Sequence, residues 1–142
     1  MTESDLRIQE VLSTVRRIAV VGLSRDPDKA SARVARDMQL GGYDVVPVHP
    51  SADRLLGKTV YARLADIPGT VDMVSVFRPA EEAPALAAQA IAIGARVFWL
   101  QLGIVSEEAA EAGKAAGLTV VMDRCFSIER ARWGPRADPE SL

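Results

Sequence analysis

The sequence predicts a doubly wound α/β domain, in which helices cover both faces of a five-stranded parallel sheet. Two observations predict this class. Short apolar segments rich in β-branched residues alternate with segments of helical spacing, which is the pattern of repeated strand–helix units. The strand-like segments are apolar on both faces, as strands are when helices cover a parallel sheet on both sides.

Length and composition limit the classes of protein to consider. The 142 residues suffice for one hydrophobic core but not for two ordinary domains. A hydrophobic content of 49% with 25% charged residues is typical of a globular protein. The net charge of −2 gives no overall basic field, so we expect no nucleic-acid partner. The longest apolar run, residues 97–105, is too short to span a membrane.

Residues 1–17 are predicted to form a helix that packs on the domain. Its apolar residues have the i, i+3, i+4, i+7 spacing of an amphipathic helix, and they are Ile8, Val11, Leu12 and Val15. Ser4 is a suitable N-cap. Charged residues in this segment interrupt any signal-peptide core, and the chain has a single cysteine, so we expect a cytoplasmic protein.

The domain itself is predicted to span residues 18–130. It begins with a strand over residues 18–21, followed by a helix that ends at Gly41 and Gly42 and a strand over residues 44–48. Pro47 indicates an irregular or terminal pairing position, because proline has no N–H to donate.

The second half of the domain repeats the alternation. Residues 52–70 are mixed, with a short helical turn near residues 64–67. Helices with Pro84 in the first turn and with Ser106 as N-cap then separate three further strands, at residues 71–77, 95–103 and 118–123. Residues 131–142 are polar and carry prolines, so we expect a loose tail. The whole pattern predicts a Rossmann-like fold.

In such folds ligands bind beyond the carboxyl ends of the strands, near the point where the strand order reverses. Polar side chains, glycine or proline follow every predicted strand, in chain order Gly22, Ser24, Arg25 and Lys29, then His49 and Pro50, then Phe77 and Arg78, then Gln101 and Gly103, then Cys125. One polar strand end is ordinary, because strands lead into loops. Five at one edge of a sheet predict a binding site.

The turn after the first strand favours a phosphate ligand. Gly22 allows close approach of the backbone, and the turn leads into a helix N-terminus. The glycine fingerprint of dinucleotide enzymes and the phosphate loop of NTPases are both absent. An NAD enzyme would carry an acid after the second strand, where this chain has His49. The basic residues Arg25, Lys29 and Arg78 favour a ligand with several phosphates.

No catalytic residue and no metal site is predicted. His49 is the sole histidine, and a lone histidine is weak evidence for acid–base catalysis. Cys125 is either a small buried apolar residue or a reactive thiol. No cluster has the spacing of metal ligands. A small dinucleotide-dependent oxidoreductase or a Cys125-dependent thiol enzyme is the alternative to a binding protein.

Six segments resemble the family of stand-alone CoA-binding domain proteins and, more distantly, the CoA-binding domain of the succinyl-CoA synthetase alpha subunit. In order they are AVVGLSRDPDKAS, YDVVPVHP, GKTVYARLADIP, VDMVSVFR, ARVFWLQLGIVSEEAAEAGKAAGL and VVMDRC. They lie within residues 18–125. The resemblance implies a Rossmann-like CoA-binding domain whose ligand is coenzyme A.

The resemblance also implies residue roles. The nucleotide and its phosphates would contact Gly22, Ser24, Arg25, Lys29 and Ser31. The adenosine side would be lined by Pro47, His49 and Pro50, the middle by Phe77 and Arg78, and the remaining wall by Gln101, Gly103 and Cys125. Two positions depart from the family, which usually has Asn in place of His49 and a Glu-His pair in place of Glu129-Arg130.

The resemblance implies binding of CoA or an acyl-CoA without synthetase chemistry. The synthetases add a phosphohistidine loop and a nucleotide-grasp module, for which these 142 residues leave no room. The protein would then be a carrier, a sensor or the partner of a separate enzyme. A redox role, with a mixed disulfide between CoA and Cys125, is a further hypothesis. The protein partner and the oligomeric state stay open.

Overall fold

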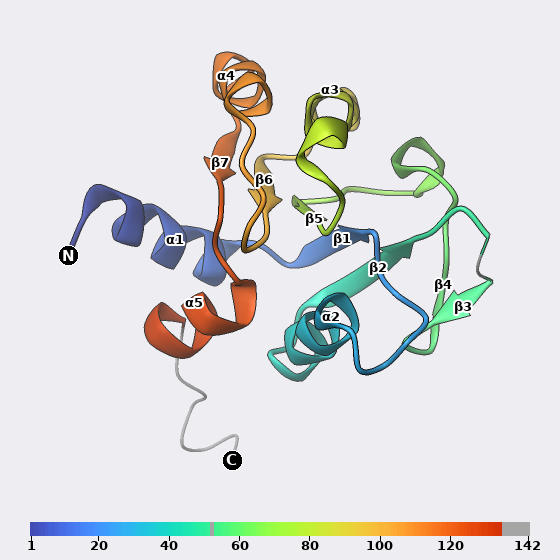
Figure 1. The fold of residues 1–142 in the computed structure, drawn as a ribbon. Helices are drawn as coiled ribbons and strands as arrows, with labels where there is room; N and C mark the ends of the chain where they lie inside the picture. The colour runs from blue at the N-terminus through green and yellow to red at the C-terminus, as the bar shows by residue number, and fades with distance from the viewer. Residues whose placement is uncertain (52, 135–142) are drawn as a thin grey trace.

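The computed structural model describes residues 1–51 and 53–134 and confirms the doubly wound α/β class (Figure 1). Five parallel strands form the sheet in the order β2-β1-β5-β6-β7. They are β1 (Arg17–Val21), β2 (Asp44–Val48), β5 (Met73–Val76), β6 (Val97–Leu100) and β7 (Thr119–Val121). Strand β1 pairs with β2 on one side and β5 on the other, so the strand order reverses at β1. The fold is therefore Rossmann-like, as predicted.

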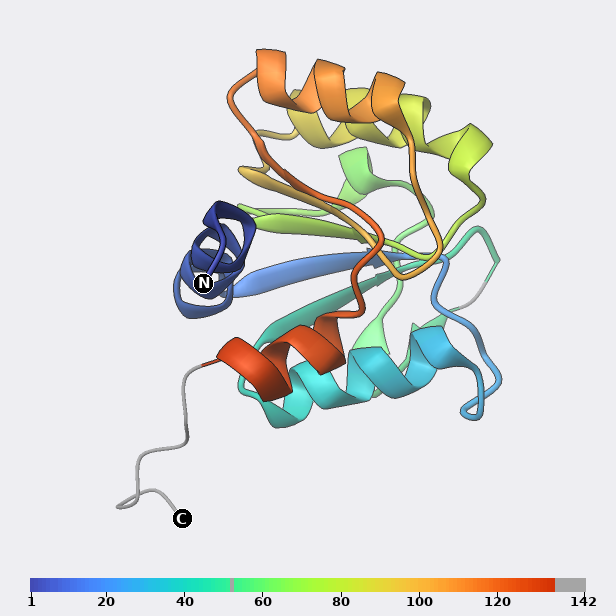
Figure 2. The same cartoon turned by 60° about the vertical axis from the view of Figure 1, so that its left-hand side comes forward.

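Helices cover both faces of the sheet (Figure 2). On one face, α1 (Glu3–Thr14), α2 (Ala30–Leu40) and α5 (Phe126–Trp133) share an apolar cluster with the sheet. The opposite face carries a second cluster with α3 (Ala83–Ala92), α4 (Glu107–Ala115) and the 3-10 turn η1 (Leu64–Asp66). A second 3-10 turn, η2 (Ala80–Glu82), leads directly into α3. Burial on both faces explains why the strands carry apolar residues almost throughout.

Aromatic contacts fasten α5 to the sheet. The rings of Trp99 and Phe126 are fully buried and meet edge to face with centroids 5.3 Å apart. The indole N–H of Trp99 donates to the Arg124 carbonyl at 2.8 Å. The ring of Tyr43 packs against Phe126 at the same centroid separation of 5.3 Å. Trp99 is thus a core residue.

Helix α5 was not predicted from the sequence. Its buried face carries Glu129 where an apolar residue would mark a helical stripe, and the Arg124 guanidinium donates to this carboxylate at 2.7 Å. Arg130 binds Asp37 of α2 at 3.0 Å. The helix continues to Trp133, into the range predicted to be a tail, and the rest of that tail lies outside the described residues except for Gly134.

Two other local expectations need correction. The N-cap of α1 is Thr2 rather than Ser4, because Thr2 and Asp5 form a reciprocal capping box. The segment before η1, predicted to be mixed, contains a two-stranded hairpin of β3 (Arg54–Leu55) and β4 (Lys58–Thr59). Such short strands leave no periodicity for a sequence pattern to reveal.

Pro47 does not have the irregular or terminal pairing position that was predicted, since it lies within β2 in regular register. It lies on β2, an edge strand of the five-stranded sheet, level with Val20 of β1. Its carbonyl accepts a hydrogen bond from the Tyr61 amide at 3.1 Å on the outer side. The missing N–H of proline is tolerated there because no full strand pairs with that side.

Asp72 joins the amino-terminal ends of the central strands. Its carboxylate accepts hydrogen bonds from the Arg16 and Arg17 amides, both at 2.9 Å. Burial alone raises the pKa of Asp72, but these hydrogen bonds and the charge of Arg96 outweigh it and hold the pKa below its usual value of 3.8. The charged carboxylate is therefore favoured in the folded protein.

We predict that Asp72→Asn lowers the free energy of unfolding by about 1–2 kcal/mol at pH 7, because an amide replaces a charged acceptor of two backbone hydrogen bonds. A depressed carboxylate pKa stabilises the fold above the unfolded pKa, and this contribution is lost as pH falls through the folded pKa. Urea unfolding at pH 7 and at successively lower pH should therefore show the two proteins converging below about pH 4.

Glu111→Gln is the control for this prediction, since Glu111 is exposed on α4. It should unfold like the wild type at both ends of the pH range. A stability difference between Asp72→Asn and the wild type that stays constant with pH would contradict the role given to the carboxylate charge.

Candidate functional site

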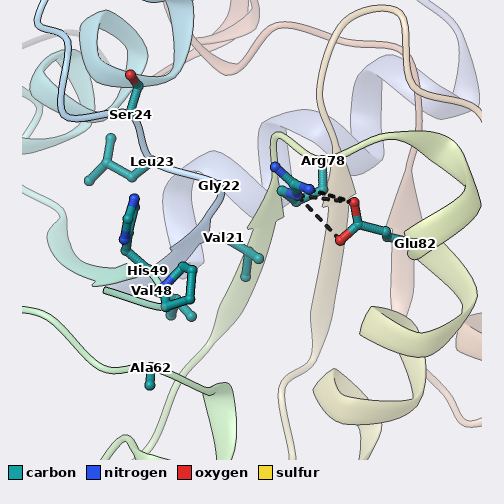
Figure 3. A pocket seen from close by; sticks show the side chains of 10 residues that line it. Val21, Gly22, Leu23, Ser24, Val48, His49, Ala62, Arg78 and Glu82 are labelled. Atoms are coloured by element: carbon teal, nitrogen blue, oxygen red, sulfur yellow. Dashed lines mark hydrogen bonds and ion pairs between the residues drawn. The ribbon is translucent and has the colours of Figure 1, made fainter. Parts of the chain in front are cut away.

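The register of the sheet brings three strand ends together. Val21 lies level with Val48 of β2 and with Val76 of β5. The residues that follow these positions therefore leave the sheet side by side, where the strand order reverses. A cavity of about 450 Å³ opens there (Figure 3), which we call the switch-point pocket. It is lined by Val21, Gly22, Leu23, Ser24, Val48, His49, Pro50, Ala62, Arg78 and Glu82.

Gly22 is required by the close approach of two chain segments. Its φ of +88° lies in the left-handed region. A Cβ at this position would meet the Phe77 carbonyl oxygen at 2.7 Å and the Arg78 Cδ at 2.9 Å. The carboxyl ends of β1 and β5 can therefore meet only over a residue without a side chain, and the Arg78 stem occupies the space that this leaves.

Side-chain hydrogen bonds shape the turn between β1 and α2. The Ser24 amide donates to the hydroxyl of Ser31 at 2.9 Å, and Ser31 is buried at the start of α2. The Ser24 hydroxyl in turn accepts from the Asp26 amide at 3.0 Å. The Ser31 hydroxyl thus stabilises the turn between β1 and α2, although Ser31 does not line the pocket. Lys29 is exposed just before α2 and also lies outside the lining.

Ser51 connects the two loops beside the pocket. The Arg25 guanidinium donates to the Ser51 carbonyl oxygen at 2.9 Å and to its hydroxyl at 3.2 Å. The Ser51 amide donates to Nδ1 of His49 at 3.1 Å, and the His49 amide donates to the Tyr61 carbonyl at 3.0 Å. Arg25 is therefore engaged with the neighbouring loop, and the His49 ring is oriented at the pocket wall.

Arg78 and Glu82 form an ion pair at the other side of the pocket. Nε of Arg78 donates to both carboxylate oxygens, at 3.1 and 3.3 Å, and its terminal nitrogen donates at 2.8 Å (Figure 3). Both side chains are about half exposed. Glu82 was not predicted as a site residue. Its separation from Arg78 by four positions was the signal available in the sequence.

The remaining predicted residues lie outside the pocket lining. Gln101 is buried; its amide donates to the Ser75 hydroxyl at 2.9 Å and accepts from the Phe126 amide at 3.0 Å. The Gly103 amide donates to the Asp123 carboxylate at 2.7 Å. Phe77 and Cys125 are half-buried against the core, with Cys125 directly before α5, and Pro47 is buried in β2. Contact of these residues with a ligand stays a prediction.

The pocket offers hydrogen-bond donors to an anion. Arg78 supplies a guanidinium, Ser24 a hydroxyl, and His49 an imidazole, while Val21 and Val48 give an apolar floor. Among residues 1–51 and 53–134, no group of three acidic, histidine or cysteine side chains is placed to hold a metal ion. No helix within this described part is long and apolar enough to cross a membrane.

Known proteins resemble this chain over most of its length. A family model described as CoA binding domain matches residues 16–131. An uncharacterized protein of Bacillus subtilis, YneT, is 43% identical over 128 residues, which cover 90% of this chain and 95% of YneT. The structure of a hypothetical protein from Pyrococcus horikoshii superimposes with a TM-score of 0.88 at 34% identity, covering 94% of this chain and 92% of that one.

An enzyme is among the proteins that resemble part of this chain. The ADP-forming acetate–CoA ligase II of Archaeoglobus fulgidus is 32% identical over 74 residues, which are 51% of this chain but only 11% of the ligase. The similarity therefore concerns a small part of that enzyme.

We predict that Gly22→Ala destabilises the protein by about 2–4 kcal/mol, because the new Cβ is strained at positive φ and also collides with backbone at 2.7 Å. Denaturant unfolding measures the loss. The collision also displaces the Arg78 stem, so side-chain NMR signals of the Arg78 guanidinium should shift.

Gly42→Ala is the matched control. Its φ of +90° is equally strained, but a Cβ there would meet no atom within 4 Å. It should cost only about 1 kcal/mol, the penalty for the left-handed conformation alone. Equal losses for the two variants would show that the approach of β5 to Gly22 is not tight.

Proposed function

Because this chain belongs to the CoA-binding domain family, we propose that it binds coenzyme A, or an acyl-CoA, in the switch-point pocket. The observation that carries the proposal is the meeting of Gly22, His49 and Arg78 around one cavity where the strand order reverses. In open α/β sheets this crevice is the place where nucleotide ligands bind.

The phosphates of CoA suit the inner part of the pocket. The turn after β1 leads into the N-terminus of α2, which favours negative charge, and Arg78 supplies a cation across from it. The diphosphate would lie between them. Lys29 and Arg25, both exposed beside this turn, would face the more distant 3′-phosphate.

The adenosine and pantetheine parts would extend in opposite directions. The adenosine would lie toward His49, Pro50 and Ala62, which form the wall on the β2 side. A cavity of about 450 Å³ holds only part of CoA, so the arm would continue along the sheet edge toward Phe77 and Cys125. Leu102, 64% exposed at this edge, offers an apolar surface to it.

The proposed role is binding without catalysis. The ligase relative shares only a short segment with this chain, and we infer that the shared segment corresponds to its CoA-binding part. The chain would act as a carrier, a sensor or the partner of a separate enzyme. The free thiol of Cys125 suits a reducing compartment, so we place the protein in the cytoplasm.

We predict that titration calorimetry ranks CoA above dephospho-CoA, and dephospho-CoA above NAD and ATP. Arg78→Ala should weaken CoA binding about tenfold, because it removes a charged donor from a phosphate. Native mass spectrometry of the purified protein should also show bound CoA.

Arg7→Ala is the control for Arg78→Ala. Arg7 forms an ion pair with Glu3 at the same four-residue separation, but on α1, away from the pocket lining. Its loss should leave CoA affinity unchanged. Tighter binding of NAD than of CoA, or no heat with CoA at all, would refute the proposed function.

A further inference from the structure

The ion pair of Arg78 and Glu82 places a negative charge inside a pocket proposed to bind phosphates. The guanidinium contacts the carboxylate at 2.8, 3.1 and 3.3 Å, so its donors on that side are already engaged. Both residues line the switch-point pocket. An entering anion therefore meets an arginine whose charge is largely balanced, with a carboxylate beside it.

The backbone explains why the two side chains meet. The Arg78 stem lies against Gly22, where a Cβ would come within 2.9 Å of Cδ, so its path toward the pocket is confined. Pro79 is the N-cap of the turn η2, which brings Glu82 round to the same side as Arg78 (Figure 3). The pair is held across a tight turn, not along the surface of a helix.

Glu82 is free to leave Arg78 without breaking the start of α3. It occupies the N-cap position of that helix, but its side chain makes no capping hydrogen bond. The carboxylate thus contacts the guanidinium in place of the helix amides. Since the two side chains are 47% and 45% exposed, the pair is weak enough for a phosphate to displace.

We propose that the Glu82 carboxylate competes with CoA for Arg78. CoA must displace this carboxylate before its own phosphate can bind the guanidinium. Without ligand, the carboxylate binds the guanidinium and holds it in the pocket. When CoA binds, its diphosphate replaces the carboxylate as the partner of the guanidinium. Glu82 thereby lowers the affinity of the pocket for phosphate ligands and sets how readily they leave. This inference rests on the proposed function of CoA binding.

The diphosphate is the expected ligand group because of where Arg78 lies. Its stem packs on Gly22, directly before the β1–α2 turn over which a diphosphate lies in folds of this kind. The 3′-phosphate is at the other end of the nucleotide ribose. The effect of Glu82 should therefore be the same with CoA and dephospho-CoA.

The test is calorimetry with CoA on the wild type, Glu82→Gln and Glu81→Gln. Because Glu82→Gln removes the competing charge, this variant should bind CoA about three- to tenfold more tightly than the wild type. Glu81 precedes Glu82 in the same turn, is also exposed, and does not line the pocket. Glu81→Gln makes the same charge change, so it should stay within about twofold of the wild type.

A double-mutant cycle separates competition from simple repulsion. If Glu82 acts by occupying Arg78, most of the gain from Glu82→Gln should disappear in an Arg78→Ala background. An equal gain in both backgrounds would overturn the competitor role. A gain seen with CoA but absent with dephospho-CoA would overturn the assignment to the diphosphate.

Different results would refute CoA binding and the competitor role of Glu82. Wild-type protein that gives no binding heat with CoA refutes CoA binding itself. Wild-type protein that binds CoA, with Glu82→Gln no tighter than Glu81→Gln, refutes only the competitor role. Circular dichroism of each variant confirms that the fold is retained, as expected for exposed positions.

Discussion

The pairing of β1 with both β2 and β5 is the constraint on which the candidate site depends. Because all three strands are parallel and in register at Val21, Val48 and Val76, their loops leave the sheet at one edge. The following connections must diverge, one toward α2 and another toward α3, and this divergence opens the pocket between them. The site is thus a consequence of strand order.

Close contact at this edge decides which groups enter the pocket. The absence of a side chain on Gly22 lets the Phe77 carbonyl and the Arg78 stem approach the end of β1. The buried hydroxyl of Ser31 fixes the adjoining turn through the Ser24 amide. Gly22 and Ser31 shape this edge without charge, since Gly22 sets the position of the Arg78 stem and Ser31 that of the adjoining turn.

Buried polar contacts stabilise the rest of the edge. Gln101, at the end of β6, connects Ser75 of β5 with the first amide of α5. Glu129 is almost fully buried in α5 and is bound by Arg124. Buried polar groups are costly to leave without partners, so the contacts of Gln101 favour one position of α5 over the sheet, while Oε2 of Glu129 has no hydrogen-bond partner in the described part of the chain. Cys125 lies between Arg124 and Phe126 in the sequence, so the hydrogen bonds of these two residues also set its position at the edge of the sheet.

The sequence by itself determined the alternation of five strands with helices and the edge of the sheet that carries the polar residues, because the spacing of apolar residues can be read from neighbouring positions. It missed α5, since the buried Glu129 interrupts the apolar stripe. Only the tertiary structure decided that Gln101 faces Ser75 and Phe126, that Ser31 supports the turn from beneath, and that Glu82 shares the pocket with Arg78. The contacts of Gln101 join segments whose meeting depends on strand order, which leaves no mark in the local pattern of residues. The pair of Arg78 and Glu82 is marked in the sequence only by its four-residue spacing, and the geometry of the turn between them decides that it forms in the pocket.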